Sequence, residues 1–278
     1  MSQPGSLYIV PTPIGNLQDI TLRALDVLRD VSAIGCEDTR HSRVLLQHFN
    51  IDKPTFALHD HNESAQITKV IQRLEMGESI ALISDAGTPL ISDPGYGLVH
   101  ACRLADHSVI ALPGPCAAIT ALSASGLPTD QFMFRGFLPV KQQAKQHAIS
   151  ELNHAYYTSI FYESPRRVLD TMKVMDTELD AEIIIVLAKE LTKTFETFVS
   201  GSAQKIIDWL EATPVHQKGE FVLMVGPASK STSEISLEAQ SLFIQLQAHL
   251  PPKKAAGIVA EHYGLKKNAI YQWSLSLE

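Results

Sequence analysis

The sequence contains no long apolar run. A helix that crosses a membrane needs roughly 20 consecutive apolar residues, and no stretch of the 278 residues approaches that length. The opening residues, MSQPGS, are too short and too polar for a secretory signal peptide. We therefore expect a soluble, cytoplasmic protein with no membrane partner, and the hydrophobic content of 45% is sufficient for a sizeable core.

Cysteine is scarce. The chain has three, Cys36, Cys102 and Cys116, which are widely spaced and match no metal-ligand pattern. An odd number of distant cysteines in a protein of a reducing compartment predicts free thiols. We expect neither a disulfide nor a bound metal.

Positive charge is also in short supply. The chain has 23 Lys and Arg residues against 30 Asp and Glu residues, which gives a formal net charge of -7. Non-specific nucleic-acid binding depends mainly on contacts of Lys and Arg with phosphate, so this charge argues against a protein that coats nucleic acid indiscriminately. A local basic region remains compatible with this charge, because four lysines lie near the C-terminus: Lys253, Lys254, Lys266 and Lys267.

The glycine-containing loops match neither of the common phosphate-binding fingerprints, G-x-G-x-x-G and G-x-x-x-x-G-K-[ST]. They follow two expected parallel strands instead. The apolar run at 80–83 gives way to SDAGTP, and the run at 108–112 gives way to PGP. Open α/β sheets bind ligands at this edge, where a missing Cβ lets the ligand approach the backbone. We predict an active-site crevice here that takes a nucleoside without a phosphate cradle.

The order of the expected elements predicts two α/β domains and a helical extension. Residues 1–126 alternate short apolar runs with helical patterns, as a parallel sheet with helical crossovers requires. Residues 127–230 are expected to form a second α/β domain, with strands at 132–138, 159–163, 182–188 and 220–225. Residues 231–278 are expected to form the rest of a Ser- and Thr-rich linker that begins at 227, followed by helices at 237–249, at 253–262 and from about Lys267.

Charged clusters follow two strands of the first expected domain. The apolar run at 31–34 leads into EDTRH, and the run at 56–58 leads into HDHNE. Charge at a strand end commonly faces the ligand crevice or caps a helix. A metal site at His59–Glu63 is disfavoured, because adjacent residues of a strand point to opposite faces. A helix start capped by Asp60 or Asn62 fits better.

Eight segments together carry a resemblance to a known family. They are LYIVPTPIGNLQDITLRALDVL, EDTRHS, ALHDHNE, SDAGTPLISDPGYGLV, LPGPCAAITALSASGLP, FYESPRR, KELTK and PPKKAAGIVAEHYGLKKNAIY. They closely resemble the ribosomal RNA small subunit methyltransferase I family of the tetrapyrrole methylase superfamily, and they span nearly the whole chain in the family's order.

The resemblance implies two α/β domains with S-adenosylmethionine bound in the cleft between them, and a homodimer. It also implies 2′-O-methylation of a cytidine ribose in the decoding region of 16S rRNA, within the small ribosomal subunit. By position in the motifs, the cofactor pocket takes residues from Pro13, Asp85, Gly87, Thr88, Pro89, Ala117, Ala118, Phe161, Tyr162 and Leu191.

Methyl transfer to a ribose hydroxyl suggests which side chains take part. The reaction is an in-line displacement, so holding the two reactants aligned supplies much of the catalysis, and a positioned base can take the hydroxyl proton. The candidates, which the sequence does not rank, are Glu37, Asp38, His59, Asp60, His61, Glu63 and Lys189. The alternative is that several of them are helix caps or interdomain ion pairs.

RNA contacts are expected from basic side chains. Arg40 and Arg166 suit the flanking phosphates, since guanidinium binds phosphate in a bidentate way. Lys253 and Lys254 start one expected tail helix, while Lys266 and Lys267 start the next. The apolar residues of the tail must pack on something, so the alternative is a helical cap that stabilises the second domain or the dimer.

Two rival functions share parts of this pattern. A tetrapyrrole or other small-molecule C-methylase would have the same fold and cofactor, but it would have little use for the lysines of the tail. A non-catalytic ribosome-assembly factor would keep the RNA surface and lose the chemistry. Cofactor binding distinguishes the second rival, and methyl transfer to RNA distinguishes the first.

Overall fold

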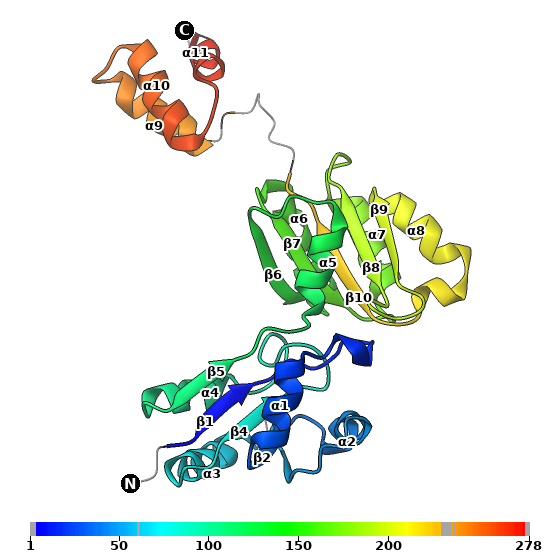
Figure 1. Cartoon of the computed structure of the whole chain (residues 1–278). Helices are drawn as coiled ribbons and strands as arrows, with labels where there is room; N and C mark the ends of the chain where they lie inside the picture. Colours follow the sequence, from blue (N-terminus) through cyan, green and yellow to red (C-terminus); the bar gives the residue numbers. More distant parts are fainter. Residues whose placement is uncertain (1–3, 60–61, 229–234, 236, 276–278) are drawn as a thin grey trace. The chain divides into compact units, whose positions relative to one another are not determined.

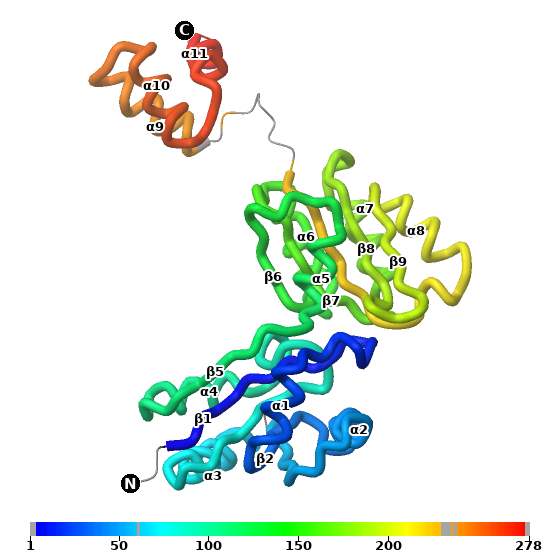
Figure 2. The backbone as a smooth tube through the Cα atoms, in the orientation of Figure 1, coloured from blue at the N-terminus to red at the C-terminus, as the bar shows by residue number. Residues whose placement is uncertain are grey.

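The computed structural model describes residues 4–59, 62–228, 235 and 237–275 of the chain. The chain forms two compact units, Met1–Ala228 and Ser229–Glu278. Figure 1 shows the elements of each unit, and Figure 2 traces the backbone through them. The first unit contains both β-sheets, and the elements described in the second are all helices.

The first sheet has five parallel strands in the order β3-β2-β4-β1-β5. The strands are β1 (Ser6–Ile9), β2 (Ala33–Cys36), β3 (Thr55–Ala57), β4 (Ile80–Ile83) and β5 (Ser108–Ala111). The helices between them are η1 (Leu17–Asp19), α1 (Leu22–Asp30), α2 (Thr39–His48), α3 (Glu63–Glu75) and α4 (Tyr96–Leu104). The parallel strands expected at 80–83 and 108–112 are confirmed.

Helices cover both faces of this sheet, as Figure 1 shows. Alternate residues of a strand face opposite sides. Leu7 and Ile9 of β1 therefore pack with α3 and α4, whereas Tyr8 and Val10 pack with α1 and α2. A strand that is buried on both sides must be apolar throughout, which explains the unbroken apolar run of β4.

The second sheet is mixed, with the order β6-β7-β10-β8-β9. Its strands are β6 (Phe132–Phe137), β7 (Thr158–Glu163), β8 (Ile185–Lys189), β9 (Thr197–Gly201) and β10 (Phe221–Val225). Only the β6–β7 pair among these is parallel. The helices are α5 (Ala117–Ser125), α6 (Gln142–Ser150), η2 (Glu151–His154), α7 (Val168–Glu178), α8 (Ala203–Ala212) and η3 (Pro214–Gln217).

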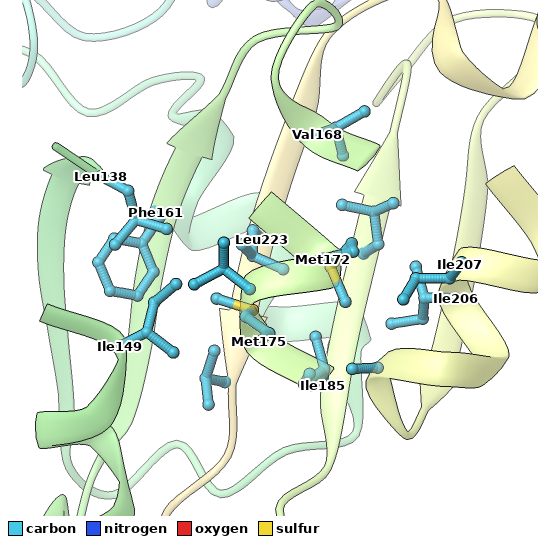
Figure 3. Packing of buried hydrophobic residues seen from close by; sticks show 14 of the residues in the cluster. Leu138, Ile149, Phe161, Val168, Met172, Met175, Ile185, Ile206, Ile207 and Leu223 are labelled. Carbon is cyan, nitrogen blue, oxygen red and sulfur yellow. The ribbon is translucent and has the colours of Figure 1, made fainter. Parts of the chain in front are cut away.

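The larger core of the first unit lies between this sheet and helices α6, α7 and α8. Figure 3 shows Met172 and Met175 of α7 packed among Phe161 and Leu223 of the sheet. Helix α5 packs on the other face, where its small residues meet alternate residues of β8 and β10. That second face also receives Ile14, which follows β1. Ile14, which follows a strand of the first sheet, thus packs on the second sheet.

Two local expectations from the sequence differ from the structure. β9 was not predicted, because its residues TFVSG are only partly buried and give no apolar run. Asn62 occupies the N-cap of α3, as one of the two predicted caps, but its side chain makes no capping bond. Its amide oxygen instead accepts from the backbone N of His59 at 2.9 Å, and its amide nitrogen donates to the carbonyl of Ala57 at 3.0 Å.

The second unit consists of α9 (Leu237–Gln247), α10 (Pro252–Tyr263) and α11 (Lys267–Leu275). Its core is formed by Phe243 of α9, Val259 of α10 and Ile270 of α11, with the Trp273 ring 5.7 Å from that of Phe243. The three predicted tail helices are confirmed. Most of the predicted linker lies outside the described residues.

Some chemical possibilities are limited by the described residues. None of the described helices has both the length and the apolar character needed to cross a bilayer. All three cysteines are free, with Cys36 and Cys102 buried. Within residues 4–59, 62–228, 235 and 237–275, no group of three or more His, Cys, Asp and Glu side chains is arranged to hold a metal ion.

Candidate functional site

A pocket with a volume of about 340 Å³ lies in the first unit, between loops of the two sheets. This volume falls within the range of small-molecule sites. One wall comes from the loops that follow the parallel strands: Ile14 after β1, residues 86–88 and 91–93 after β4, and Cys116 and Ala117 after β5. This is the strand edge at which the sequence predicts a ligand crevice.

The other wall comes from the second sheet. It consists of Phe137 at the end of β6, residues 162–165 at the end of β7, Leu191 after β8, and residues 220–222 at the start of β10. Because β10 runs antiparallel to β7 and β8, its first residues lie level with the last residues of those strands. The pocket therefore requires both sheets to be folded.

Charge in the pocket is of one sign. Three carboxylates line it, from Asp93, Glu163 and Glu220. Among the described residues, no Lys, Arg or His side chain does so. Several of the remaining lining residues are apolar, including Ile14, Phe137 and Leu191. An anionic phosphate would meet repulsion here, whereas a ligand with positive charge and apolar surface suits these walls.

Hydrogen bonds join the loops of the first wall. Gly87 and Thr12 exchange backbone hydrogen bonds of 2.9 and 3.0 Å, so the loop after β4 pairs with the loop after β1. The Thr88 hydroxyl donates to the carbonyl of Pro115 at 2.8 Å, which attaches the same loop to the one after β5. The backbone of the three loops is thus fixed where a ligand would contact it.

Gly87 is required by its backbone conformation. Its φ of +79° lies in the left-handed region, which residues with a side chain rarely adopt. A Cβ at this position would lie 3.2 Å from the Cγ2 atom of Ile14, itself a pocket residue. Any larger side chain here would be strained and would crowd the pocket.

Tyr162 and Glu163 form the end of β7 in the second wall. Burial raises the pKa of Tyr162 to about 12, so its phenol remains protonated at neutral pH. Glu163 is fully buried and accepts hydrogen bonds from the Ser164 backbone N and the Thr171 hydroxyl, both at 2.7 Å. The Arg167 guanidinium lies 3.6 Å from the same carboxylate. This network fixes the turn that follows β7.

The structure brings half of the predicted cofactor residues together at the pocket. Those that line it are Gly87, Thr88, Ala117, Tyr162 and Leu191. Those that are not among its lining residues are Pro13, Asp85, Pro89, Ala118 and Phe161. Phe161 belongs to the core on the helix-covered face of β7, because neighbouring residues of a strand face opposite sides. Asp85 instead accepts a hydrogen bond of 3.3 Å from the backbone N of Asp38.

None of the described members of the predicted catalytic set lies in the pocket wall. Asp38 is the N-cap of α2 and is bound by the side chain of Arg40. The Arg40 guanidinium holds the pKa of Asp38 well below its usual range, and the Asp38 side chain is 35% exposed. Glu37 next to it is partly buried.

The other predicted catalytic residues are spread over both sheets. The Glu63 carboxylate accepts from the backbone N of Leu98 at 3.0 Å and so fixes the start of α4. Lys189 is buried at the end of β8, level with the pocket residue Phe221. His59 is partly buried, and Asp60 and His61 lie outside the described residues.

The predicted RNA-binding side chains are exposed. Arg166 follows directly on the pocket residue Pro165, and the side chain of Arg40 is 90% exposed. The four predicted lysines of the second unit, hereafter the tail lysines, are exposed at the starts of α10 and α11: Lys253, Lys254, Lys266 and Lys267.

Sequence reasoning missed several pocket residues. Phe221 and Val222 belong to a predicted strand, but only the sheet order brings that strand to the pocket. Cys116 was expected only to be a free thiol, and Asp93 was assigned no role. The second Ser-Asp pair of SDAGTPLISDPG, at residues 92 and 93, was the available signal for Asp93.

Comparison with known proteins places this fold and site in a class. Residues 6–207 match the family of Tetrapyrrole (Corrin/Porphyrin) Methylases. Diphthine synthase has the same fold at 12% identity, with a TM-score of 0.63 over 80% of this chain and 90% of that one. Uroporphyrin-III-C-methyltransferase from Thermus thermophilus is similar at 20% identity, with a TM-score of 0.56 over 81% of this chain and 95% of that one.

Full-length relatives narrow the class further. The protein named ribosomal RNA small subunit methyltransferase I is 52% identical in Pasteurella multocida, over 98% of this chain and 97% of the relative. Its counterpart in Vibrio cholerae is 53% identical, over 97% of this chain and 94% of the relative. Residues 233–278 match the RsmI C-terminal HTH domain. The chain belongs to the ribosomal RNA small subunit methyltransferase I family within the tetrapyrrole methylases.

Proposed function

We propose that the protein is an S-adenosylmethionine-dependent methyltransferase that 2′-O-methylates a cytidine ribose in the decoding region of 16S rRNA. The observation that carries the proposal is the pocket at the strand ends, which has three carboxylates and, among the described residues, no basic side chain. It occurs in a chain of the rRNA methyltransferase family. A ribosomal substrate implies that the protein acts in the cytoplasm.

The pocket residues fit this cofactor. S-adenosylmethionine supplies an electrophilic methyl group on a positively charged sulfonium, and it also carries an ammonium group, a carboxylate and the flat heteroaromatic ring of adenine. Asp93, the pocket carboxylate that forms no ion pair within the described part of the chain, favours the cation, while Ile14 and Leu191 offer apolar surface to the ring. Gly87, Thr88 and Ala117 bring fixed backbone close to the ligand. We assign these residues, together with Tyr162, to cofactor binding.

The remaining predicted residues are proposed to serve the substrate side. We assign residues 1–126 and 127–230 to the two domains that share the cofactor cleft, with the acidic and histidine-containing loops after β2 and β3 facing the RNA. Arg40 and Arg166 are assigned to phosphates that flank the target ribose. Holding the ribose in line with the methyl group is the main catalytic task of these residues.

The tail lysines are proposed to bind RNA phosphates. The N-terminus of a helix favours anions, so two lysines in the first turn of α10 are placed where their charge does not stabilise the helix. The Lys267 side chain lies 3.6 Å from the position that a Cβ of Gly257 would take. Since Gly257 lies one helical turn after Lys253, Lys267 lies near the face of α10 that carries Lys253. Such convergence suits a phosphate backbone.

A homodimer is proposed as the working form. The exposed edge strand β6 supports it, because Phe132 and Met133 remain 44% exposed there. Exposed apolar edge strands are usually covered by another chain or element. Analytical ultracentrifugation of the wild type and of Met133→Lys tests this part, since a monomeric wild type would contradict it.

The central experiment combines cofactor binding with product mapping. Calorimetry with S-adenosylmethionine should give measurable binding, which a non-catalytic assembly factor would lack. Small ribosomal subunits lacking the modification are then incubated with the protein and cofactor, and reverse transcription at low nucleotide concentration locates the stop caused by a 2′-O-methyl group. A methyl group on a base atom, or on a tetrapyrrole but not on RNA, would refute the proposal.

A further inference from the structure

The three carboxylates of the pocket are not equivalent. Glu163 is occupied by the hydrogen bonds from the Ser164 backbone and the Thr171 hydroxyl. Glu220 is exposed and forms an ion pair of 3.0 Å with Lys193. The Arg167 guanidinium lies 3.6 Å from Glu163, so both of these carboxylates have a basic partner within the protein.

Asp93 is the exception. It lines the pocket, is partly buried and, within the described part of the chain, forms no ion pair with a Lys, Arg or His side chain. Burial raises the pKa of Asp93. The hydrogen bond from the Ser84 hydroxyl lowers this pKa in part, and the nearby negative charge of Asp85 raises it further. Tyr162 lines the opposite wall of the same pocket, and its pKa is raised mainly by burial and in smaller part by Cys116 and Asp93.

The loop that carries Asp93 is held in one conformation. Thr88 is bonded to the carbonyl of Pro115. Leu90 has a φ of +74°, a left-handed conformation that is costly for a residue with a branched side chain. Such strain persists only where the surrounding structure enforces it, and it concentrates at functional sites. The carboxylate is thus presented to the pocket on a fixed backbone.

We propose that Asp93 is the general base of the reaction, the group that accepts the 2′-hydroxyl proton of the target ribose; this rests on the function proposed above. In the step, an oxygen lone pair of the hydroxyl forms the new bond to the methyl carbon. The sulfur–carbon bond breaks, and its electron pair remains on sulfur, which becomes a neutral thioether. The hydroxyl proton passes to an oxygen of Asp93, which later releases it to water.

The placement and charge of Asp93 favour this role over that of the residues considered from the sequence. A general base works best when its pKa lies near the working pH. Burial brings the pKa of Asp93 closer to the working pH, whereas the guanidinium of Arg40 lowers the pKa of Asp38 further below it. Asp93 also lines the cofactor pocket, which Asp38 does not.

The test compares the wild type with Asp93→Asn, which keeps the shape of the side chain and removes the base. Single-turnover methylation of small ribosomal subunits at saturating S-adenosylmethionine should slow by roughly 10²–10⁴-fold, the usual contribution of a general base. Calorimetry sets the saturating cofactor concentration for each protein, because Asp93 is the pocket carboxylate without an ion pair among the described residues and its replacement is expected to weaken binding of the cation. Asp93→Glu should recover part of the rate. Asp176→Asn, on an exposed turn of α7, is the matched control and should behave as the wild type.

The pH profile supplies a second readout. A base acts only when deprotonated, so the wild-type rate should rise with pH through a pKa above the ordinary value for Asp, and this rise should disappear in Asp93→Asn. Carboxyl ¹³C NMR of the wild type without substrate should show the same raised pKa in a signal that the variant lacks.

The outcomes of these experiments distinguish failure of the proposed function from failure of the inference about Asp93. If the wild type transfers no methyl group to ribose, the proposed function fails, and the base role falls with it. If the wild type is active and Asp93→Asn matches its rate and pH profile, the inference about Asp93 fails alone. It also fails if the variant loses cofactor affinity but keeps the wild-type rate at saturation, because Asp93 would then only bind the cation.

Discussion

The buried carboxylate of Glu163 provides a quantitative test of how the pocket is held together. Glu163→Ala leaves the hydroxyl of the fully buried Thr171 and the backbone N of Ser164 without their acceptor. Each orphaned donor costs about 1–3 kcal/mol, and the Arg167 guanidinium loses its carboxylate neighbour as well. Removing one partner of a buried pair typically costs about 3–5 kcal/mol, which is the loss of unfolding free energy that we expect.

Glu220→Ala is the matched control for this measurement. It removes another pocket carboxylate, but one whose side chain is 76% exposed. Its partner Lys193 keeps a second ion pair of 2.9 Å, with Glu190. Exposed pairs contribute little, so the control should lose less than about 1 kcal/mol.

Urea denaturation followed by far-UV circular dichroism measures both losses. A Glu163→Ala variant that loses no more than Glu220→Ala would refute the reasoning. A double-mutant cycle with Thr171→Val isolates the hydrogen bond, and it should give a coupling energy of about 0.5–3 kcal/mol. A coupling energy of zero would show that the 2.7 Å contact stabilises nothing.

Three further predictions concern the ligands. Gly87→Leu should abolish S-adenosylmethionine binding in calorimetry while leaving the circular dichroism spectrum unchanged. The control is Gly126→Leu, which is equally strained at φ +75° but has open space around it and should bind the cofactor normally. Equal cofactor affinities in both variants would remove Gly87 from the site. Changing the tail lysines to glutamine should weaken subunit binding and flatten the slope of log affinity against log salt by roughly 0.7–0.9 per lost contact, with unaltered cofactor affinity, and normal binding at every salt concentration would make them structural. Cys116 lines the pocket, so iodoacetamide should label it more slowly when cofactor is present. The buried Cys102, with a pKa of about 11, should stay protonated and unlabelled at pH 8. A labelling rate of Cys116 that is the same with and without cofactor would contradict the assignment.

Much of the fold was accessible from the sequence because its signals are local. The apolar runs of β4 and β5 end in glycine- and proline-containing turns, and that local pattern predicts a parallel strand. β9 gave no such signal because its residues, TFVSG, mix polar and apolar side chains and are only partly buried.

Less of the candidate site could be predicted from the sequence, because the site depends on which side of its strand each residue faces and on the order of the strands in the sheet. Phe161 and Tyr162 are adjacent in an apolar strand, and only packing decides which of them faces the helices and which the pocket. Phe221 enters the pocket through the position of β10 between β7 and β8, a pairing that distant segments establish together. The charged residues beside Asp38 follow a strand end as expected, yet the observed contacts of Asp38 are those of a helix cap.

Both sheets contribute walls to the pocket, so the concentration of the ligand affects how much folded protein is present. Ile14 and Val222 meet at one cavity only in the folded chain, so a ligand there binds the native state and has no site on the unfolded chain. At a free concentration one hundred times its dissociation constant, such a ligand adds about 2.7 kcal/mol to the free energy of unfolding. Differences of this size change how much of a protein escapes proteolysis in a cell. Depletion of the methyl donor would then reduce the amount of enzyme as well as its rate.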